Sequence, residues 1–301
     1  MSTEAARVPL TTADTRIHIT HRTARWDDRP ATLSDALDFW PFAAGAANVV
    51  MQLSWPGVGR GVAESKVDSG NLMKHPWKRA RTTFSYLAVA ILGNPGDRAA
   101  YRDAVDDVHR QVRSALGSPV AYSAFDRDLQ MWVAACLFVG LEDTYQLLRG
   151  GLTDELAEQF YRSASTLGTT LQVSESQWPV TRADFDRYWN EACQRVVVDD
   201  GVRSYLQDLI DLRMVSALLR PAFAPLLRFL TVGFLAPVFR ETLQVEWTPG
   251  QQRRFEHLFL LVAFVNRFLP RFIRQGGSYL LLADVRRRIR LRRNLILKGS
   301  L

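Results

Sequence analysis

The sequence lacks most of the signals that mark secreted and membrane-spanning proteins. It has two cysteines in 301 residues, too few for a disulfide framework, so we expect a reducing compartment. No apolar run reaches the roughly 18 residues of a membrane-spanning helix, because prolines and arginines interrupt the most hydrophobic region, residues 221–240. The N-terminal residues lack the basic start and apolar stretch of a secretory signal. These absences predict a cytoplasmic protein.

Signatures of several enzyme classes are also missing. There is no Gly-rich phosphate loop, no Cys/His zinc spacing and no Gly-x-Ser-x-Gly elbow, which argues against phosphoryl transfer, zinc chemistry and acyl transfer. The pairs Asp106-Asp107 and Asp199-Asp200 invite comparison with the magnesium-binding acids of a helical terpene-type synthase. That chemistry needs a third carboxylate one turn later, and positions 110 and 203 are arginine. Both pairs are better interpreted as solvated faces or helix caps.

The basic character of the chain is confined to its C-terminal end. The net charge is +7, and residues 286–298 hold six arginines and Lys298 with no acid, so the rest of the chain carries no net charge. The sequence therefore predicts no nucleic-acid-binding face. The segment from Asp284 to Lys298 spaces apolar residues among the arginines. It is either a basic amphipathic helix that makes peripheral contact with an anionic membrane, or a helix packed on the body with its arginines in water.

Apolar residues recur with helical spacing over most of the chain, and alternating runs typical of strands are few. We expect an irregular N-terminal arm over residues 1–33, an all-helical domain over 34–285 and a basic C-terminal helix or tail over 286–301. Helix-capping and helix-breaking residues (Pro, Gly, Asp and Thr) predict where the helices begin and end. The expected helices are 76–92, 97–116, 126–148, 153–167, 181–195, 201–219, 222–244, 248–272 and 278–297.

One histidine stands out as a candidate metal ligand. Of the five histidines, His109 alone borders an apolar face in mid-helix, and a neutral imidazole is the commonest axial ligand of haem iron in helical proteins. The alternative is a partly exposed helix residue that pairs with Asp106 or Arg113. Arg79 and Thr83 are four residues apart, so they share a face of the helix 76–92, where they could bind carboxylates or oxygen ligands. Their alternative is a solvated helix face.

Several short motifs occur in an order that resembles the MpaB-like family of haem oxygenases, whose best-known relatives are the rubber-cleaving latex clearing proteins. The resemblance covers about residues 35–290. The matching text is Met51-Gln52-Leu53-Ser54-Trp55-Pro56, Gly61-Val62-Ala63-Glu64, Trp77-Lys78-Arg79-Ala80-Arg81-Thr82-Thr83, Gly93-Asn94-Pro95, Val108-His109-Arg110-Gln111-Val112-Arg113 and, near the C-terminus, Asn266-Arg267-Phe268-Leu269-Pro270.

The resemblance implies a single all-α, multi-helix domain with a globin-like haem-binding core. It implies haem b, with His109 as the iron ligand and with Arg79 and Thr83 beside the haem. Glu64 matches the carboxylate proposed as a catalytic base. The implied activity is that of an oxygenase, an oxidoreductase that acts with dioxygen on an apolar substrate of isoprenoid or lipid type.

The chain also departs from the family pattern. The usual His-Pro near position 55 is Trp55-Pro56, the histidine common after a Trp-Val pair is Ala134, and the lysine before the signature threonine is Thr82. These losses leave a second hypothesis open, a haem-binding or apolar-ligand-binding helical protein without turnover. A third is a haem-free helical protein attached to a membrane or partner through its basic tail.

Overall fold

The computed structural model of the protein describes residues 9–19, 32–64 and 72–296. Within these ranges the regular structure is helical, and the β-type contact is an isolated antiparallel bridge between Arg113 and Ser123. The expected all-α, single-domain fold is confirmed, while the globin-like core stays a prediction. Parts of the expected N-terminal arm, including His21, and the end of the tail, including Lys298, lie outside the described residues.

The elements follow one another as α1 (Thr12–Thr15), η1 (Leu33–Ala36), α2 (Pro41–Leu53), α3 (Pro56–Ala63), α4 (Pro76–Leu92), α5 (Pro95–His109), α6 (Arg127–Arg149), α7 (Asp154–Arg162), α8 (Thr166–Thr169), α9 (Arg182–Cys193), α10 (Asp200–Ile210), α11 (Arg220–Gly233), α12 (Pro237–Leu243), α13 (Pro249–Phe268) and α14 (Arg271–Arg290).

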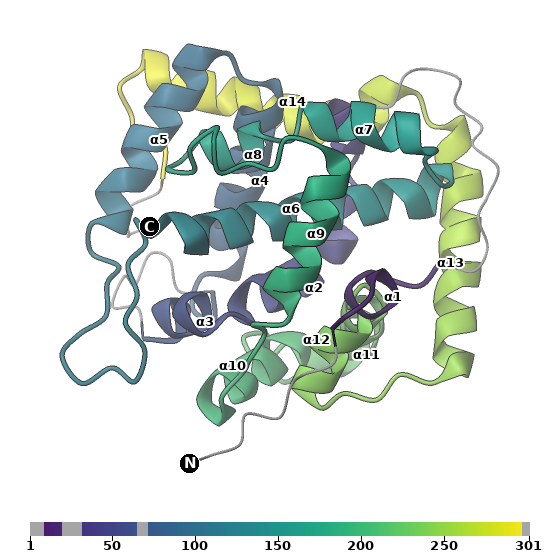
Figure 1. Cartoon of the computed structure of the whole chain (residues 1–301). Coiled ribbons are helices and arrows are strands. Elements are labelled where there is room, and N and C mark those ends of the chain that lie inside the picture. The colour runs from purple at the N-terminus through teal and green to yellow at the C-terminus, as the bar shows by residue number, and fades with distance from the viewer. Residues whose placement is uncertain (1–8, 20–31, 65–71, 297–301) are drawn as a thin grey trace.

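Helix α6 runs through the middle of the molecule and organises the core (Figure 1). The carboxylate of Asp126 caps its N-terminus by accepting hydrogen bonds from the next free backbone N–H groups. Most of its side chains are buried. Trp132 lies between two other indoles, with ring centroids 4.8 Å from Trp55 and 5.1 Å from Trp189 and nearly parallel planes. This stack fixes α6 against the start of α3 and against α9.

Helices α4 and α5 form the frame for the candidate site residues. As predicted, α4 begins with Pro76 and ends before Gly93. Asn94 caps α5 in a reciprocal pair with Asp97, each side chain accepting a hydrogen bond from the other's backbone N–H. By its spacing Trp77 belongs to the apolar stripe of α4, yet it is 86% exposed. The reason is that continuous burial along α4 begins only at Ser85.

The expected helix 97–116 was too long, because α5 ends at His109. The following residues turn back on themselves: Ala124 donates its N–H to the carbonyl of Val112, and Ser114 donates to the carbonyl of Tyr122, both at 2.9 Å. This return places Val112, Tyr122 and Ala124 against a cavity. Tertiary contact therefore outweighs the helical spacing of this segment.

Other helix limits were also misjudged. Helix α10 stops at Ile210 and is followed by Leu212 at φ 53°. The helix expected at 222–244 is divided into α11 and α12, with Pro237 at the first position of the second. The helix expected at 153–167 is divided into α7 and α8. Helix α14 begins directly after Pro270, seven residues earlier than expected, and ends at Arg290 instead of residue 297.

The basic C-terminal segment lies on the body of the protein as far as residue 296. Helix α14 packs against α4 and buries Leu282 and Val285. Arg286 donates two hydrogen bonds to the Asp97 carboxylate at 2.9 and 3.0 Å. Asp284 accepts hydrogen bonds from Arg81 and Arg288, both at 2.7 Å. In the described part of the chain, none of the helices combines the length and the apolar character needed to cross a membrane.

Candidate active site

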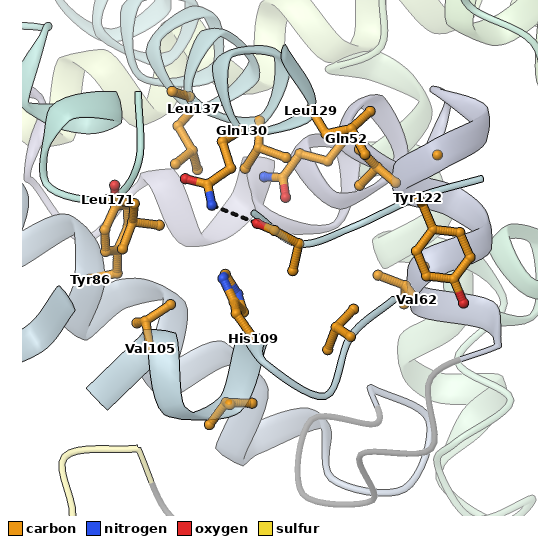
Figure 2. Close-up of a pocket in the computed structure, with 18 of the residues that line it drawn as sticks. Gln52, Val62, Tyr86, Val105, His109, Tyr122, Leu129, Gln130, Leu137 and Leu171 are labelled. Atoms are coloured by element: carbon orange, nitrogen blue, oxygen red, sulfur yellow. Dashed lines mark hydrogen bonds between the residues drawn. The ribbon is translucent and has the colours of Figure 1, made fainter. Parts of the chain in front are cut away.

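A cavity of about 260 Å³ lies where α3, α4, α5 and α6 meet the returning segment 110–126. Its wall is mostly apolar, and the side chains that show this are Val62, Val105, Leu129, Leu137 and Leu171. Figure 2 shows the His109 ring in the middle of this lining, with Tyr86 and Val105 on one side and Val62 and Tyr122 on the other. The volume is close to the lower limit of about 300 Å³ for small-molecule pockets.

A second cavity of about 70 Å³ adjoins the first and shares several lining residues with it. The shared residues are Gln52, Leu53, Val62, Arg79 and Leu137. Phe84 and Pro41 line only the second cavity. The two hollows are therefore separated by side chains of α2, α3, α4 and α6 rather than by backbone.

His109 is the last residue of α5, and its ring meets the Phe125 ring edge-on with centroids 6.3 Å apart. Nδ1 is buried without a hydrogen-bond partner. Neither ring nitrogen bonds to any residue in the described part of the chain, so the alternative pairing with Asp106 or Arg113 does not occur. Burial, and secondarily the charge of Arg79, lower the pKa of His109 to about 4. The imidazole is therefore neutral at physiological pH, which is the form that binds metals.

Arg79 projects from α4 and lines both cavities. Its side chain has a large accessible surface although protein surrounds it closely. The two observations agree because the surface that Arg79 exposes faces the cavities. Within the described residues its guanidinium makes no hydrogen bond or ion pair, and burial lowers its pKa. An unpaired guanidinium in an apolar hollow is a strong binding group for an anion or an oxygen ligand.

Thr83 does not face the main cavity. It lines the second one, and its hydroxyl donates to the carbonyl of Arg79 at 3.1 Å within α4. The residue that lines the main cavity is its neighbour Thr82, whose hydroxyl donates to the carbonyl of Lys78 at 3.0 Å. Both threonine hydroxyls are thus bonded within their own helix in this structure.

Glu64 does not line either cavity. Its carboxylate accepts hydrogen bonds from the hydroxyl of Ser118 at 3.0 Å and from the hydroxyl of Tyr122 at 3.2 Å, and it lies 3.4 Å from a guanidinium nitrogen of Arg60. The ring of Tyr122, whose hydroxyl bonds to Glu64, lines the main cavity. The structure therefore brings His109 and Arg79 into one cavity, places Thr83 in the adjoining one, and sets Glu64 behind Tyr122.

Gln130 is a polar residue of the cavity wall that the sequence patterns did not single out. Its amide donates to the carbonyl of Ala124 at 2.6 Å, and its carbonyl oxygen accepts the N–H of Gln172 at 3.0 Å (Figure 2). The Gln172 side chain in turn donates to Asp106, one turn before His109. This network joins α6, α5 and the segment after α8. The sequence signal that could have identified Gln130 is a single amide on the buried face of an apolar helix.

The residues that depart from the family pattern occupy defined places. Trp55 is buried in the indole stack and donates its ring N–H to the carbonyl of Ala192 at 3.1 Å. Ala134 is buried and lines the main cavity directly. A histidine in place of Ala134 would face the same hollow as His109.

The described residues contain no group of three or more His, Cys, Asp or Glu side chains arranged to hold a metal ion. Cys136 and Cys193 are both buried and unpaired. Among its lining residues the cavity offers one neutral imidazole and one guanidinium in a mostly apolar surrounding. That set fits a haem, which needs a single axial nitrogen, an apolar box and a cation for its propionates.

Comparison with known proteins identifies the family of the chain. The model of one family, described as the catalytic domain of ER-bound oxygenase mpaB/B'/Rubber oxygenase, matches residues 35–266. Two relatives, the uncharacterized protein Mb2261 of Mycobacterium bovis and the uncharacterized protein Rv2237 of Mycobacterium tuberculosis, are each 48% identical over 251 residues. These residues make up 83% of this chain and 98% of each relative.

No solved structure matches the chain significantly. The family match includes Glu64, Arg79, Thr83 and His109, and it extends from the middle of η1 to the second half of α13. Because it covers well over half of the sequence, the protein belongs to the family of mpaB and rubber oxygenase catalytic domains.

Proposed function

We propose that this protein is a b-type haem-dependent oxygenase that uses dioxygen to oxidise an apolar substrate of unsaturated isoprenoid or lipid type. Its family consists of oxygenase catalytic domains. The single observation that carries the haem assignment is His109, a neutral and unpaired imidazole in the wall of an apolar cavity.

His109 is assigned as the protein ligand of the iron. Its low pKa keeps the lone pair available, because the proton that would compete with a metal is bound only below about pH 4. Its position at the end of α5 gives the ring a fixed base, and the edge of Phe125 packs beside it. When bound, haem supplies the redox-active iron for chemistry with dioxygen.

Arg79 is assigned to bind a haem propionate or to orient oxygen, with Thr83 in support. The guanidinium is already in the cavity without a protein partner, so binding a carboxylate would break no existing contact. Thr83 lies one turn after Arg79 on the same helix, and its hydroxyl donates to the backbone carbonyl of Arg79. The apolar wall excludes water, which strengthens each charge-assisted hydrogen bond formed inside.

Glu64 is proposed as a base that takes a proton from an alkene substrate. For this role its carboxylate would have to give up the hydroxyls of Ser118 and Tyr122. This placement favours a second candidate function, that of a haem-binding or apolar-ligand-binding protein without turnover. The replacements at Trp55, Thr82 and Ala134 also favour this second candidate function.

The first experiment is an absorption spectrum of the purified protein, oxidised and reduced, after reconstitution with haem. We expect an intense porphyrin band that persists through gel filtration. His109→Ala should lose most of the retained haem, whereas His18→Ala, which changes an exposed histidine outside both cavities, should keep it. Absence of the band in the wild type would refute both haem-binding hypotheses.

Oxygen consumption separates the enzyme from the binding protein. Reconstituted protein is supplied with dispersed polyisoprenoid or an unsaturated lipid, and dissolved oxygen is followed with an electrode. Uptake that depends on substrate and is lost in His109→Ala supports the oxygenase. Haem retention without uptake on either substrate class supports the second candidate.

A further inference from the structure

Helix α13 is apolar on two opposite sides in its second half. One side is buried and holds Phe255, Phe259 and Ala263. The other side carries Leu261, Phe264, Val265 and Phe268, which recur at helical spacing and are all exposed, Phe264 by 62% and Phe268 by 67%. A helix that is apolar all round is normally buried in a core or in lipid. The outer side of α13 therefore lacks a covering layer within the described part of this chain.

The exposed apolar surface continues onto α14. After the corner at Pro270, Phe272 is 74% exposed and Ile273 and Leu280 are exposed as well. We call the exposed side chains of Leu261, Phe264, Val265, Phe268, Phe272, Ile273 and Leu280 the α13–α14 face. Seven exposed apolar side chains on two consecutive helices mark a candidate interaction site.

The charges around this face are mostly positive. From residue 257 to residue 296 the sequence has nine arginines and one acid, Asp284. That acid already accepts hydrogen bonds from Arg81 and Arg288. Arg267 and Arg271 alternate with Phe268 and Phe272 at the corner, and both arginines are exposed, although Arg271 also lies 3.3 Å from the carboxylate of Asp35. Further arginines extend the cationic border along α14.

We propose that the α13–α14 face docks on the surface of an anionic lipid bilayer, with the phenylalanines inserted at the acyl boundary and the arginines at the headgroups. Apolar side chains bordered by arginines are the chemistry of a helix that lies in the membrane interface. A second copy of the chain fits less well, because a two-fold contact would bring the arginines of both faces together. The described helices do not span a bilayer, so the contact is peripheral.

This docking goes beyond the proposed oxygenase function and does not depend on it. The face is formed by α13 and α14, whereas His109 and Arg79 lie on α5 and α4. α13 forms one edge of the molecule in Figure 1, well away from α5.

The test is flotation of the full-length protein with two kinds of vesicle, pure phosphatidylcholine and phosphatidylcholine mixed with phosphatidylglycerol. We expect the wild type to float with the mixed vesicles and to bind the neutral ones at least roughly tenfold more weakly. The combined variant Phe264→Ser, Phe268→Ser and Phe272→Ser should weaken binding by about tenfold for each side chain. Arg267→Gln and Arg287→Gln should each weaken it by about fivefold, and only on the anionic vesicles.

A matched control carries Leu116→Ser and Val180→Ser, two fully or nearly fully exposed apolar side chains outside the face. It should float like the wild type. Wild-type protein that stays in the buffer with both vesicles, or a serine variant that floats unchanged, would overturn the proposal. So would sedimentation that shows a dimer converted to a monomer by the three serines, because the face would then join two copies.

The haem absorption of the same samples keeps the two proposals apart. The serine variant should retain the haem content of the wild type, since none of its changes touches the cavities. Flotation without haem refutes the proposed function alone, and haem without flotation refutes the docking alone.

Discussion

The pKa of His109 makes a quantitative prediction for the haem-free protein. Burial and the nearby Arg79 lower that pKa from 6.5 to about 4. Between these two values the unfolded chain binds a proton that the folded chain excludes, so folding becomes less favourable as the pH falls. The stabilisation is complete above the unfolded pKa of 6.5 and is lost progressively as the pH falls toward 4. At about pH 4.5 the loss attributable to His109 is about 2 to 3 kcal/mol, because stability falls by about 1.4 kcal/mol for each pH unit in this window.

The assay is urea unfolding of the haem-free protein at about pH 7.5 and about pH 4.5, analysed by linear extrapolation. Acidic groups also titrate in this range, so the quantity of interest is the difference between wild type and His109→Gln, which cannot be protonated. The wild type should lose about 2 to 3 kcal/mol more than the variant. His18→Gln, which changes an exposed histidine, should lose as much as the wild type.

Arg79→Met provides a second arm of the same experiment. Removing the positive charge should raise the pKa of His109, so the extra loss at low pH should shrink. It should not vanish, because burial is the larger cause of the lowered pKa. Equal losses in the wild type and in His109→Gln would show that the imidazole is solvated, and the assignment of His109 as a buried neutral ligand would then be abandoned.

Four substitutions give additional tests of the structure. Arg79→Met should not destabilise the haem-free protein in urea unfolding, because the Arg79 guanidinium makes no hydrogen bond or ion pair within the described residues, and it should weaken haem retention in the absorption assay. Glu142→Gln should cost about 3 kcal/mol in the same unfolding assay, since this fully buried carboxylate accepts hydrogen bonds from Arg16 and Arg182 at 2.7 to 3.1 Å. Gly233→Ala should lower the melting temperature, because a Cβ there would lie 2.2 Å from the Phe255 ring. Gly276→Ala, where nothing lies within 4 Å, should leave it unchanged or raise it.

The parts of the fold that the sequence predicts well are those whose signals are local. Pro76 and Gly93 delimit α4, and Asp126 begins α6 by capping it. Thr181 and Asp184 form a capping box at the start of α9, each side chain accepting a hydrogen bond from the other's backbone N–H. In these cases a few neighbouring residues satisfy the free backbone groups of a helix end, so no distant contact is needed.

The errors arise where distant contacts decide the local structure. Residues 110–116 have helical spacing, yet they pair with residues 122–124 and close the cavity instead. Trp77 has the right spacing for the buried side of α4 and is exposed, because spacing predicts which side a residue is on but not whether another helix covers that side. The same limit applies to α13, whose outer side carries apolar residues at helical spacing and is nevertheless exposed.

The candidate site was predictable to different degrees. Elimination among the histidines and the resemblance both led to His109, and the four-residue spacing placed Arg79 and Thr83 on one helix. The sequence could not predict that Thr83 faces a separate hollow, or that Ser118 and Tyr122 bind Glu64. The second fact depends on how the segment after α5 returns across α3, and part of this segment was expected to be helical.

The unsatisfied groups of the cavity give the clearest physical reason to assign a ligand there. Among the buried side-chain atoms that have no hydrogen-bond partner in the described part of the chain, Nδ1 of His109 is the one that belongs to a residue lining either cavity. Arg79 adds an unpaired charge to the same wall. Leaving both groups without partners makes the folded state less stable, and a bound group that accepts hydrogen bonds from the guanidinium and is ligated by the imidazole would remove that deficit. Glu64 has no such deficit, because two hydroxyls and Arg60 already satisfy it. Ligand binding therefore rests on firmer physical ground than proton abstraction by Glu64.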